Sequence, residues 1–298
     1  MILRLRPLFI MRSPILRFRQ KEYDLSQRTL IMGVLNVTPD SFSDGGRFFE
    51  WAKAVEQGRQ MAAEGADILD VGGESTRPGS NPVPEEEEVR RVIPVIEELR
   101  DKIAIPISID TRKARVAERA LEAGAQMVND VSALRFDDAM AGTVARWKAP
   151  LVLMHMRGQP ETMQVEPHYE NLIGEILGFF EERMAHALSR GVAREAIILD
   201  PGIGFGKSLE DKHNLILLKQ LRRFRALGRP LMVGTSRKAF IGRILNLPPE
   251  EREEGTMATV AVAIQNGANL VRVHEVKRVR RVVQVVDAIL HSTPESES

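Results

Sequence analysis

The chain of 298 residues contains no cysteine, which excludes disulfide bonds and thiol chemistry and suits a reducing compartment. Its 42 Lys and Arg almost cancel its 41 Asp and Glu, and a net charge of +1 gives no general attraction to nucleic acid or to a membrane surface. No apolar stretch approaches the roughly 20 residues that cross a bilayer. We therefore expect a cytoplasmic protein that binds neither nucleic acid nor membrane.

Several motifs that would indicate a particular chemistry are incomplete. Residues 201–208 resemble a phosphate-binding P-loop, but Pro201 occupies the position of its first glycine. His274 and Glu275 would need a histidine at position 278 to form a zinc protease motif, and that residue is Arg278. The six histidines have no ligand-like spacing, so we expect no structural zinc site. The chain also offers no credible nucleophile for a covalent intermediate.

What the chain does contain is a series of short apolar runs, each of which ends in a polar or glycine residue. Runs this short and this apolar are typical of parallel strands that are buried on both faces. Eight such strands are predicted: 30–36, 68–70, 105–110, 127–130, 151–155, 197–200, 231–236 and 270–274.

Helical composition and spacing alternate with these strands. The predicted helices are 52–64, 85–100, 112–123, 169–190, 209–227, 237–245, 255–266 and 276–290. Alternation of this kind predicts a parallel α/β fold. An open doubly wound sheet is the alternative. We favour a (β/α)8 TIM barrel, because eight strands are present and such barrels have about 250 residues.

The two ends of the chain lie outside this pattern, so the predicted barrel domain covers residues 29–291. Residues 1–28 alternate Arg with Leu, Ile and Phe, which is too interrupted by charge for a signal peptide. We expect this extension to form a short hairpin that covers the bottom of the barrel, with a targeting arm as the alternative. Residues 292–298 have nothing to bury and are predicted to be disordered.

The carboxyl ends of parallel barrel strands gather at one mouth, and this is where barrel enzymes carry their active sites. Two long polar loops, 36–46 and 72–80, follow the first two strands. Together with the stretches 200–207, 234–238 and 272–274, they closely resemble the dihydropteroate synthase family from about residue 30 to residue 286. Members of that family are transferases of the folate pathway. They condense dihydropterin pyrophosphate with p-aminobenzoate to give dihydropteroate and pyrophosphate.

The strand ends themselves suit a pterin ring, whose edge presents N–H donors. Asp110, Asn129 and Asp200 each end a predicted strand and carry oxygens that accept hydrogen bonds. Each could instead only cap the next helix. Three such residues around one mouth favour binding. The resemblance assigns pterin recognition to these positions and adds Lys238 on the opposite ring edge, with Met154, Phe205 and Gly234 as apolar walls and floor.

The last strand provides cationic side chains for a diphosphate leaving group. Arg272 and His274 alternate along it, so both point into the barrel mouth. The guanidinium fork suits a diphosphate, although an ion pair with a neighbouring Asp is the alternative. The resemblance implies Asn36 as a ligand for the cofactor Mg²⁺, which prefers oxygen and accompanies phosphates. It also implies that Thr76 and Arg77 contact the diphosphate.

The resemblance further implies the p-aminobenzoate pocket, the catalytic residues and a homodimer. The pocket consists of Phe42, Asp44, Thr76, Arg77, Pro78, Phe205, Ser236 and Lys238, with Ser236 as a candidate donor to the carboxylate. The implied catalytic residues are Asp110, Lys238 and Asp44. Two rival functions are a pterin-binding methyltransferase of the corrinoid-dependent type and a barrel that binds pterin or diphosphate without catalysis.

Overall fold

The computed structural model describes residues 15–19, 21–37, 47–75, 80–159 and 162–293, and in this part of the chain eight parallel strands form one sheet. In spatial order they are β8 (Ile197–Asp200), β7 (Leu151–Met154), β6 (Met127–Asp130), β5 (Ile107–Asp110), β4 (Ile68–Gly72), β3 (Leu30–Asn36), β10 (Leu270–Val273) and β9 (Met232–Val233). A parallel bridge between Leu199 and Leu231 joins β8 to the residue before β9. The sheet therefore closes, and the predicted TIM barrel is confirmed.

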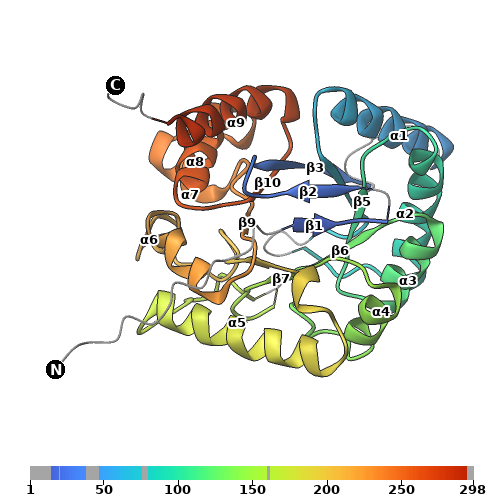
Figure 1. The fold of residues 1–298 in the computed structure, drawn as a ribbon, viewed down its shortest axis with the longest axis horizontal. Coiled ribbons are helices and arrows are strands. Elements are labelled where there is room, and N and C mark those ends of the chain that lie inside the picture. The colour runs from blue at the N-terminus through green and yellow to red at the C-terminus, as the bar shows by residue number, and fades with distance from the viewer. Residues whose placement is uncertain (1–14, 20, 38–46, 76–79, 160–161, 294–298) are drawn as a thin grey trace.

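Helices surround the barrel as an outer ring (Figure 1). They are α1 (Arg47–Ala63), α2 (Glu85–Arg100), α3 (Ala114–Ala123), α4 (Met140–Trp147), α5 (Leu172–Ser189), α6 (His213–Gln220), α7 (Ala239–Leu245), α8 (Glu253–Gln265) and α9 (Val276–His291). Short 3₁₀ turns occupy Arg194–Ala196, Leu221–Leu227 and Pro249–Glu251. The strands are buried on both faces, as their apolar runs predict.

One helix, α4, was not predicted. It has only eight residues, contains Gly142 and lacks a capping side chain at Ala139. Asp137 compensates by accepting hydrogen bonds from the backbone N–H of Ala139 (3.0 Å) and of Ala114 in α3 (2.8 Å). Because the second of these bonds is tertiary, the local pattern of the sequence does not reveal it.

A hairpin covers the bottom of the barrel, as expected for the N-terminal extension. Strands β1 (Ile15–Arg17) and β2 (Glu22–Asp24) pair antiparallel and lie in front of the barrel centre in Figure 1. The buried side chains of Leu16 and Tyr23 share one apolar cluster with residues at the amino ends of the strands, including Leu30 and Ile68. The Tyr23 hydroxyl also donates to the Asp67 carbonyl at 2.8 Å. Residues 1–14 lie outside the described part.

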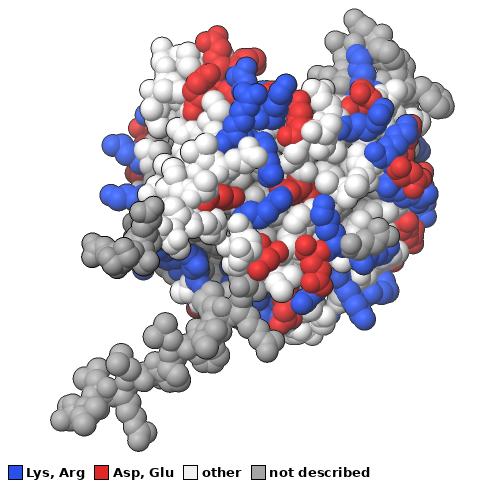
Figure 2. All heavy atoms as spheres, turned by 45° about the horizontal axis from the view of Figure 1, so that its top comes forward, with Lys and Arg blue, Asp and Glu red and all other residues white. Residues whose placement is uncertain are grey.

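Charges of both signs are interspersed on the face shown in Figure 2. Among the described residues, no helix is both long and apolar enough to span a membrane. Helix α9 ends at His291, and residues 294–298 of the predicted tail lie outside the described part of the chain. The hairpin covers one end of the barrel, and the carboxyl ends of the strands form the mouth at the opposite end.

Candidate active site

Arg272 joins two aspartates inside the mouth of the barrel. Its Nε donates to Asp70 Oδ2 at 2.7 Å, and its Nη2 donates to Asp110 Oδ2 at 2.6 Å. Both carboxylates are buried, and they come from β4 and β5, whereas Arg272 comes from β10. The ion pair that the sequence left as the less favoured alternative is therefore present, and it cross-links three strands at the mouth.

Asp70 is a central residue of this network that the sequence prediction missed. Its Oδ2 also accepts from Asn129 Nδ2 at 2.9 Å, which fixes the orientation of that amide. The remaining oxygens, Oδ1 of Asp70, Asp110 and Asn129, are buried and have no hydrogen-bond partner among the described residues. The signal for Asp70 was a charge inside an otherwise apolar strand, because such a charge needs a partner.

Burial and ion pairing act in opposite directions on this network. Burial raises the pKa of the Asp110 carboxyl to about 7, although the Arg272 guanidinium favours its ionised form. Burial also tends to lower the pKa of Arg272, but Asp70 and Asp110 outweigh this and raise it above its ordinary value. Arg272 is therefore a permanent cation between two carboxyl groups.

Asp200 ends β8 on the other side of the mouth. Its Oδ1 accepts from the backbone N–H of Gly202 at 2.8 Å, so this oxygen binds its own loop and does not cap a helix, since the next helix begins only at His213. Burial raises the pKa of Asp200 to about 6, opposed by the Gly202 hydrogen bond and by Lys238 and Arg272. Met154 pairs with Asp200 in register between β7 and β8. The carboxyl group is therefore ionised at neutral pH and lies next to an apolar wall.

Phe205 and Lys238 lie on the same side of the mouth as Asp200, because they follow the neighbouring strands β8 and β9. The Lys238 ammonium lies 4.0 Å from the centroid of the Phe205 ring, which is a favourable cation–π geometry. Phe205 packs against a buried apolar cluster that includes Met154. Three of the predicted pterin-binding residues thus lie together.

Ser236 and His274 form a hydrogen-bonded pair at the mouth of the barrel. Gly234 and Asn36 are the remaining predicted site residues in the described part of the chain. The His274 Nδ1 and the Ser236 Oγ are 2.9 Å apart. A Cβ added to Gly234 would lie 3.8 Å from the Cβ of Arg272, so this backbone passes close to the ion-pair network. Asn36 ends β3 in register with Gly72, and its side chain is partly buried.

The predicted residues Phe42, Asp44, Thr76, Arg77 and Pro78 lie outside the described part of the chain. The start of the second loop, residues 73–75, is described. The ion pairs that hold it were not predicted from the sequence. Glu74 is buried and pairs with Arg112 at 2.9 Å and with Lys113. Lys113 also pairs with the buried Glu88 of α2 at 2.5 Å. This network ties the end of β4 to α2 and α3.

The described residues provide few metal ligands at the mouth. Among them, no group of three His, Cys, Asp or Glu is placed to hold a metal ion. Asn36 offers a single amide oxygen. This donor set fits Mg²⁺, which often binds through one or two protein oxygens while substrate phosphates and water supply its other ligands. It does not fit a metal caged by the protein alone.

A closed barrel with buried, ion-paired carboxylates at its mouth is typical of barrel enzymes, which carry their active sites at this end. The sequence profile described as "Pterin binding enzyme" matches residues 32–274. A dihydropteroate synthase of Synechocystis sp. is 50% identical over 277 residues, which cover 93% of this chain and 95% of that protein. The chain therefore belongs to the dihydropteroate synthase family, which is a family of transferases.

Solved structures agree with this assignment. A Xanthomonas albilineans dihydropteroate synthase with 4-aminobenzoic acid is similar with a TM-score of 0.88 and 44% identity, covering 95% of this chain and 100% of that one. A structure of the enzyme from the same organism in complex with 7,8-dihydropteroate has a TM-score of 0.85 and 42% identity, covering 94% and 100%.

Proposed function

We propose that this chain condenses 6-hydroxymethyl-7,8-dihydropterin pyrophosphate with p-aminobenzoate, giving 7,8-dihydropteroate and pyrophosphate. The observation that carries the proposal is the set of buried oxygens without partners on Asp110 and Asn129. Unsatisfied buried acceptors are costly, so they indicate a ligand that brings N–H donors. A pterin edge provides such donors, and relatives of this chain are named for a reaction on a pterin.

In this proposal Asp110, Asn129 and Asp200 accept from the pterin N–H groups. Lys238 approaches the opposite ring edge, and its contact with Phe205 keeps the ammonium in place. Met154 and Phe205 supply the apolar wall, and Gly234, whose backbone passes close to Arg272, supplies the floor. The ring is therefore held by its edges and its faces.

The reaction replaces a carbon–oxygen bond with a carbon–nitrogen bond. The bond between the pterin methylene and the diphosphate breaks, and its electron pair leaves with the diphosphate. The amine of p-aminobenzoate attacks the methylene, and the resulting ammonium passes a proton to solvent. Asp110 stabilises the positive charge that develops on the pterin side, and Arg272 and His274, with Thr76 and Arg77, stabilise the leaving diphosphate. Mg²⁺ held at Asn36 would neutralise part of the diphosphate charge.

The second substrate binds beside the pterin methylene. Ser236 is buried and oriented by His274, so its hydroxyl is a candidate donor to the p-aminobenzoate carboxylate. Phe205 and Lys238 contribute the side of the pocket that they share with the pterin. We assign the remaining contacts to Phe42, Asp44, Thr76, Arg77 and Pro78, with Asp44 as a catalytic residue.

Detection of the product by mass spectrometry tests this function. Dihydropteroate should form when the protein receives both substrates and Mg²⁺, and it should not form when either substrate is omitted. Removal of Mg²⁺ with a chelator should abolish the activity, and added Mg²⁺ should restore it. Methyl transfer to a corrinoid without dihydropteroate formation would favour the methyltransferase alternative, which the relatives named above do not support.

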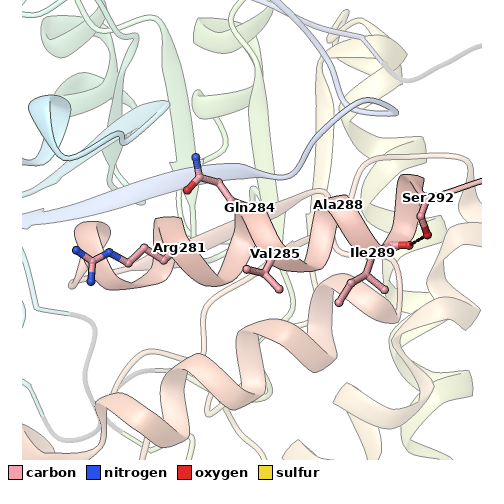
Figure 3. Close-up of a pocket in the computed structure, with 6 residues that line it drawn as sticks. All are labelled: Arg281, Gln284, Val285, Ala288, Ile289 and Ser292. Atoms are coloured by element: carbon pink, nitrogen blue, oxygen red, sulfur yellow. Dashed lines mark hydrogen bonds between the residues drawn. The ribbon is translucent and has the colours of Figure 1, made fainter.

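We further propose that the enzyme is a cytoplasmic homodimer that associates through α8 and α9. Val285 and Ile289 project from one side of α9 and line a shallow hollow there (Figure 3). Their exposed fractions are 61% and 65%, and Val262 of α8 is 42% exposed. Exposed apolar side chains gathered on adjacent helices are typical of a surface that a partner covers, and a second copy of the chain carries the same surface.

A further inference from the structure

Lys207 is a fully buried lysine next to the pterin site. Its ammonium donates to the carbonyls of Gly202 (3.0 Å) and Phe205 (2.8 Å) and lies 3.0 Å from Nδ1 of His155. Among the described residues it forms no ion pair with a carboxylate. An ammonium has three donors, and here each one faces an acceptor.

His155, the residue directly after β7, connects Lys207 to the end of that strand. Burial and the nearby Lys207 hold the pKa of His155 well below its ordinary value, so the imidazole is neutral and its Nδ1 can accept. The backbone N–H of His155 donates to the Asp200 carbonyl at 2.8 Å. Lys207 and Asp200 are therefore both tied to the end of β7 through one residue.

The segment that Lys207 holds, residues 201–206, passes close to that strand end. Gly202 has φ +70°, and a Cβ there would lie 1.9 Å from the His155 carbonyl oxygen. Gly206 has φ +59°, and its Cβ would lie 2.4 Å from the Arg157 carbonyl oxygen. Backbone packed so tightly needs hydrogen-bond partners from within the protein, and Lys207 supplies them for the carbonyls of Gly202 and Phe205.

We propose that Lys207 is a positioning residue whose buried ammonium fixes residues 201–206, so that the Asp200 carboxylate and the Phe205 ring are already placed to receive the pterin. Lys207 itself touches no substrate. The inference rests on the proposed function for the pterin, but the geometry of the loop is independent of it. Other contacts support the same segment: Asn214 Oδ1 accepts from Gly204 N at 2.7 Å, and the Tyr169 hydroxyl donates to Gly206 O at 2.8 Å.

The charge of Lys207 has a second effect, because it helps to keep Asp200 ionised. The cations that face Asp200 are Lys238, Arg272 and Lys207, and Gly202 adds a hydrogen bond. Burial lowers the pKa of Lys207 to about 7; of the charges that face it, Asp200 favours the ammonium, and Lys238 and Arg157 oppose it. Lys207 therefore carries its charge mainly below neutral pH, which is the range in which Asp200 takes up its proton. Loss of the Lys207 charge would therefore make Asp200 easier to protonate.

Hydrogen exchange in the ligand-free protein tests the positioning role. Lys207→Met removes all three donors, and the amides of residues 202–206 should exchange about tenfold faster. Lys207→Gln keeps two N–H donors without the charge and should restore part of the protection. Lys219→Met, which changes an exposed lysine of α6, is the matched control and should match the wild type. Equal protection in the wild type and in both Lys207 variants would overturn the proposal.

A pH series of pterin titrations tests the effect of the charge. In the wild type the affinity should fall in two steps as pH drops, near pH 7 as Asp110 becomes protonated and near pH 6 as Asp200 does. Both Lys207 variants should shift the lower step upward by about half a unit to one unit, whereas Lys219→Met should not. A purely structural lysine would leave the lower step unmoved, and that result would contradict the proposal. A wild-type protein that binds no pterin would contradict the proposed function, and the exchange experiment does not depend on it.

Discussion

Asp110 and Asp200 lie in the same mouth but are held by different partners. Asp110 pairs with Arg272 and keeps one buried oxygen without a partner, whereas Asp200 accepts from its own loop through Gly202. Both carboxyls have raised pKa values because they are buried. The partners and the burial of each carboxyl therefore determine which of its oxygens are available to a ligand and at which pH it is ionised.

Asp200→Asn should weaken pterin binding. The amide keeps the shape of the side chain but loses the charge, and it can place donors against the N–H groups of the ring. The expected cost is about 1.5–3 kcal/mol of binding free energy, as for a hydrogen bond to a charged group. Calorimetry on folded variant protein measures it. Unchanged affinity would mean that Asp200 only caps its loop.

Arg272→Ala should lower both stability and affinity. It leaves Asp70 and Asp110 buried without their cation, which should cost about 3 kcal/mol of unfolding free energy in a urea titration. The variant should also weaken the pyrophosphate-bearing substrate more than free pterin, because only the former carries the diphosphate. Equal losses for the two ligands would show that Arg272 acts only as a structural ion pair.

Sequence reasoning found the residues at the strand ends because a polar residue that terminates an apolar run is visible locally. It missed Asp70 and Lys207, whose roles arise only from partners brought by the fold. Arg272 lies 202 positions from Asp70 in the chain. Lys207 belongs to the stretch that resembles an incomplete P-loop. Its three acceptors come together only because the loop passes close to the end of β7.

The helices and strands also divide into features that are visible locally and features that depend on the fold. The strands could be predicted because burial on both faces requires apolar residues throughout. Helix ends could not always be predicted. The predicted helix 209–227 starts only at His213, after Lys212 adopts φ +56°, and it changes to a 3₁₀ turn at Leu221. These helix ends depend on packing between the helices and the barrel, which the local sequence does not specify.

The hairpin β1–β2 should contribute to stability without affecting catalysis, because it lies at the opposite end of the barrel from the site. Leu16 is only 1% exposed, so Leu16→Ala should cost about 2–4 kcal/mol of unfolding free energy. Urea titration measures this, and kcat/KM of the folded variant should equal that of the wild type. Arg17→Ala, on the exposed side of β1, is the control. A Leu16→Ala protein as stable as the wild type would show that the hairpin is not docked in solution.

At the scale of the whole molecule, the closed barrel has the hairpin at its bottom and the site at its mouth, while α8 and α9 expose apolar side chains on the outside. If α8 and α9 form the dimer interface, the wild type should sediment at twice the chain mass of 33.4 kDa. Ile289→Glu places a charge in that interface and should yield monomers. Gln60→Glu, on the exposed face of α1, adds the same charge elsewhere and should leave the dimer intact. A monomeric wild type, or an Ile289→Glu dimer, would contradict the assignment.

The most direct test of the whole account is the stoichiometry of products from the wild type and from Asp110→Asn. With dihydropterin pyrophosphate, p-aminobenzoate and Mg²⁺, the wild type should release one pyrophosphate for each dihydropteroate formed. Asp110→Asn loses the carboxylate that stabilises the developing positive charge, so kcat should fall by about 100-fold or more. The account would be contradicted if the wild type formed no dihydropteroate, or if Asp110→Asn turned over as fast as the wild type.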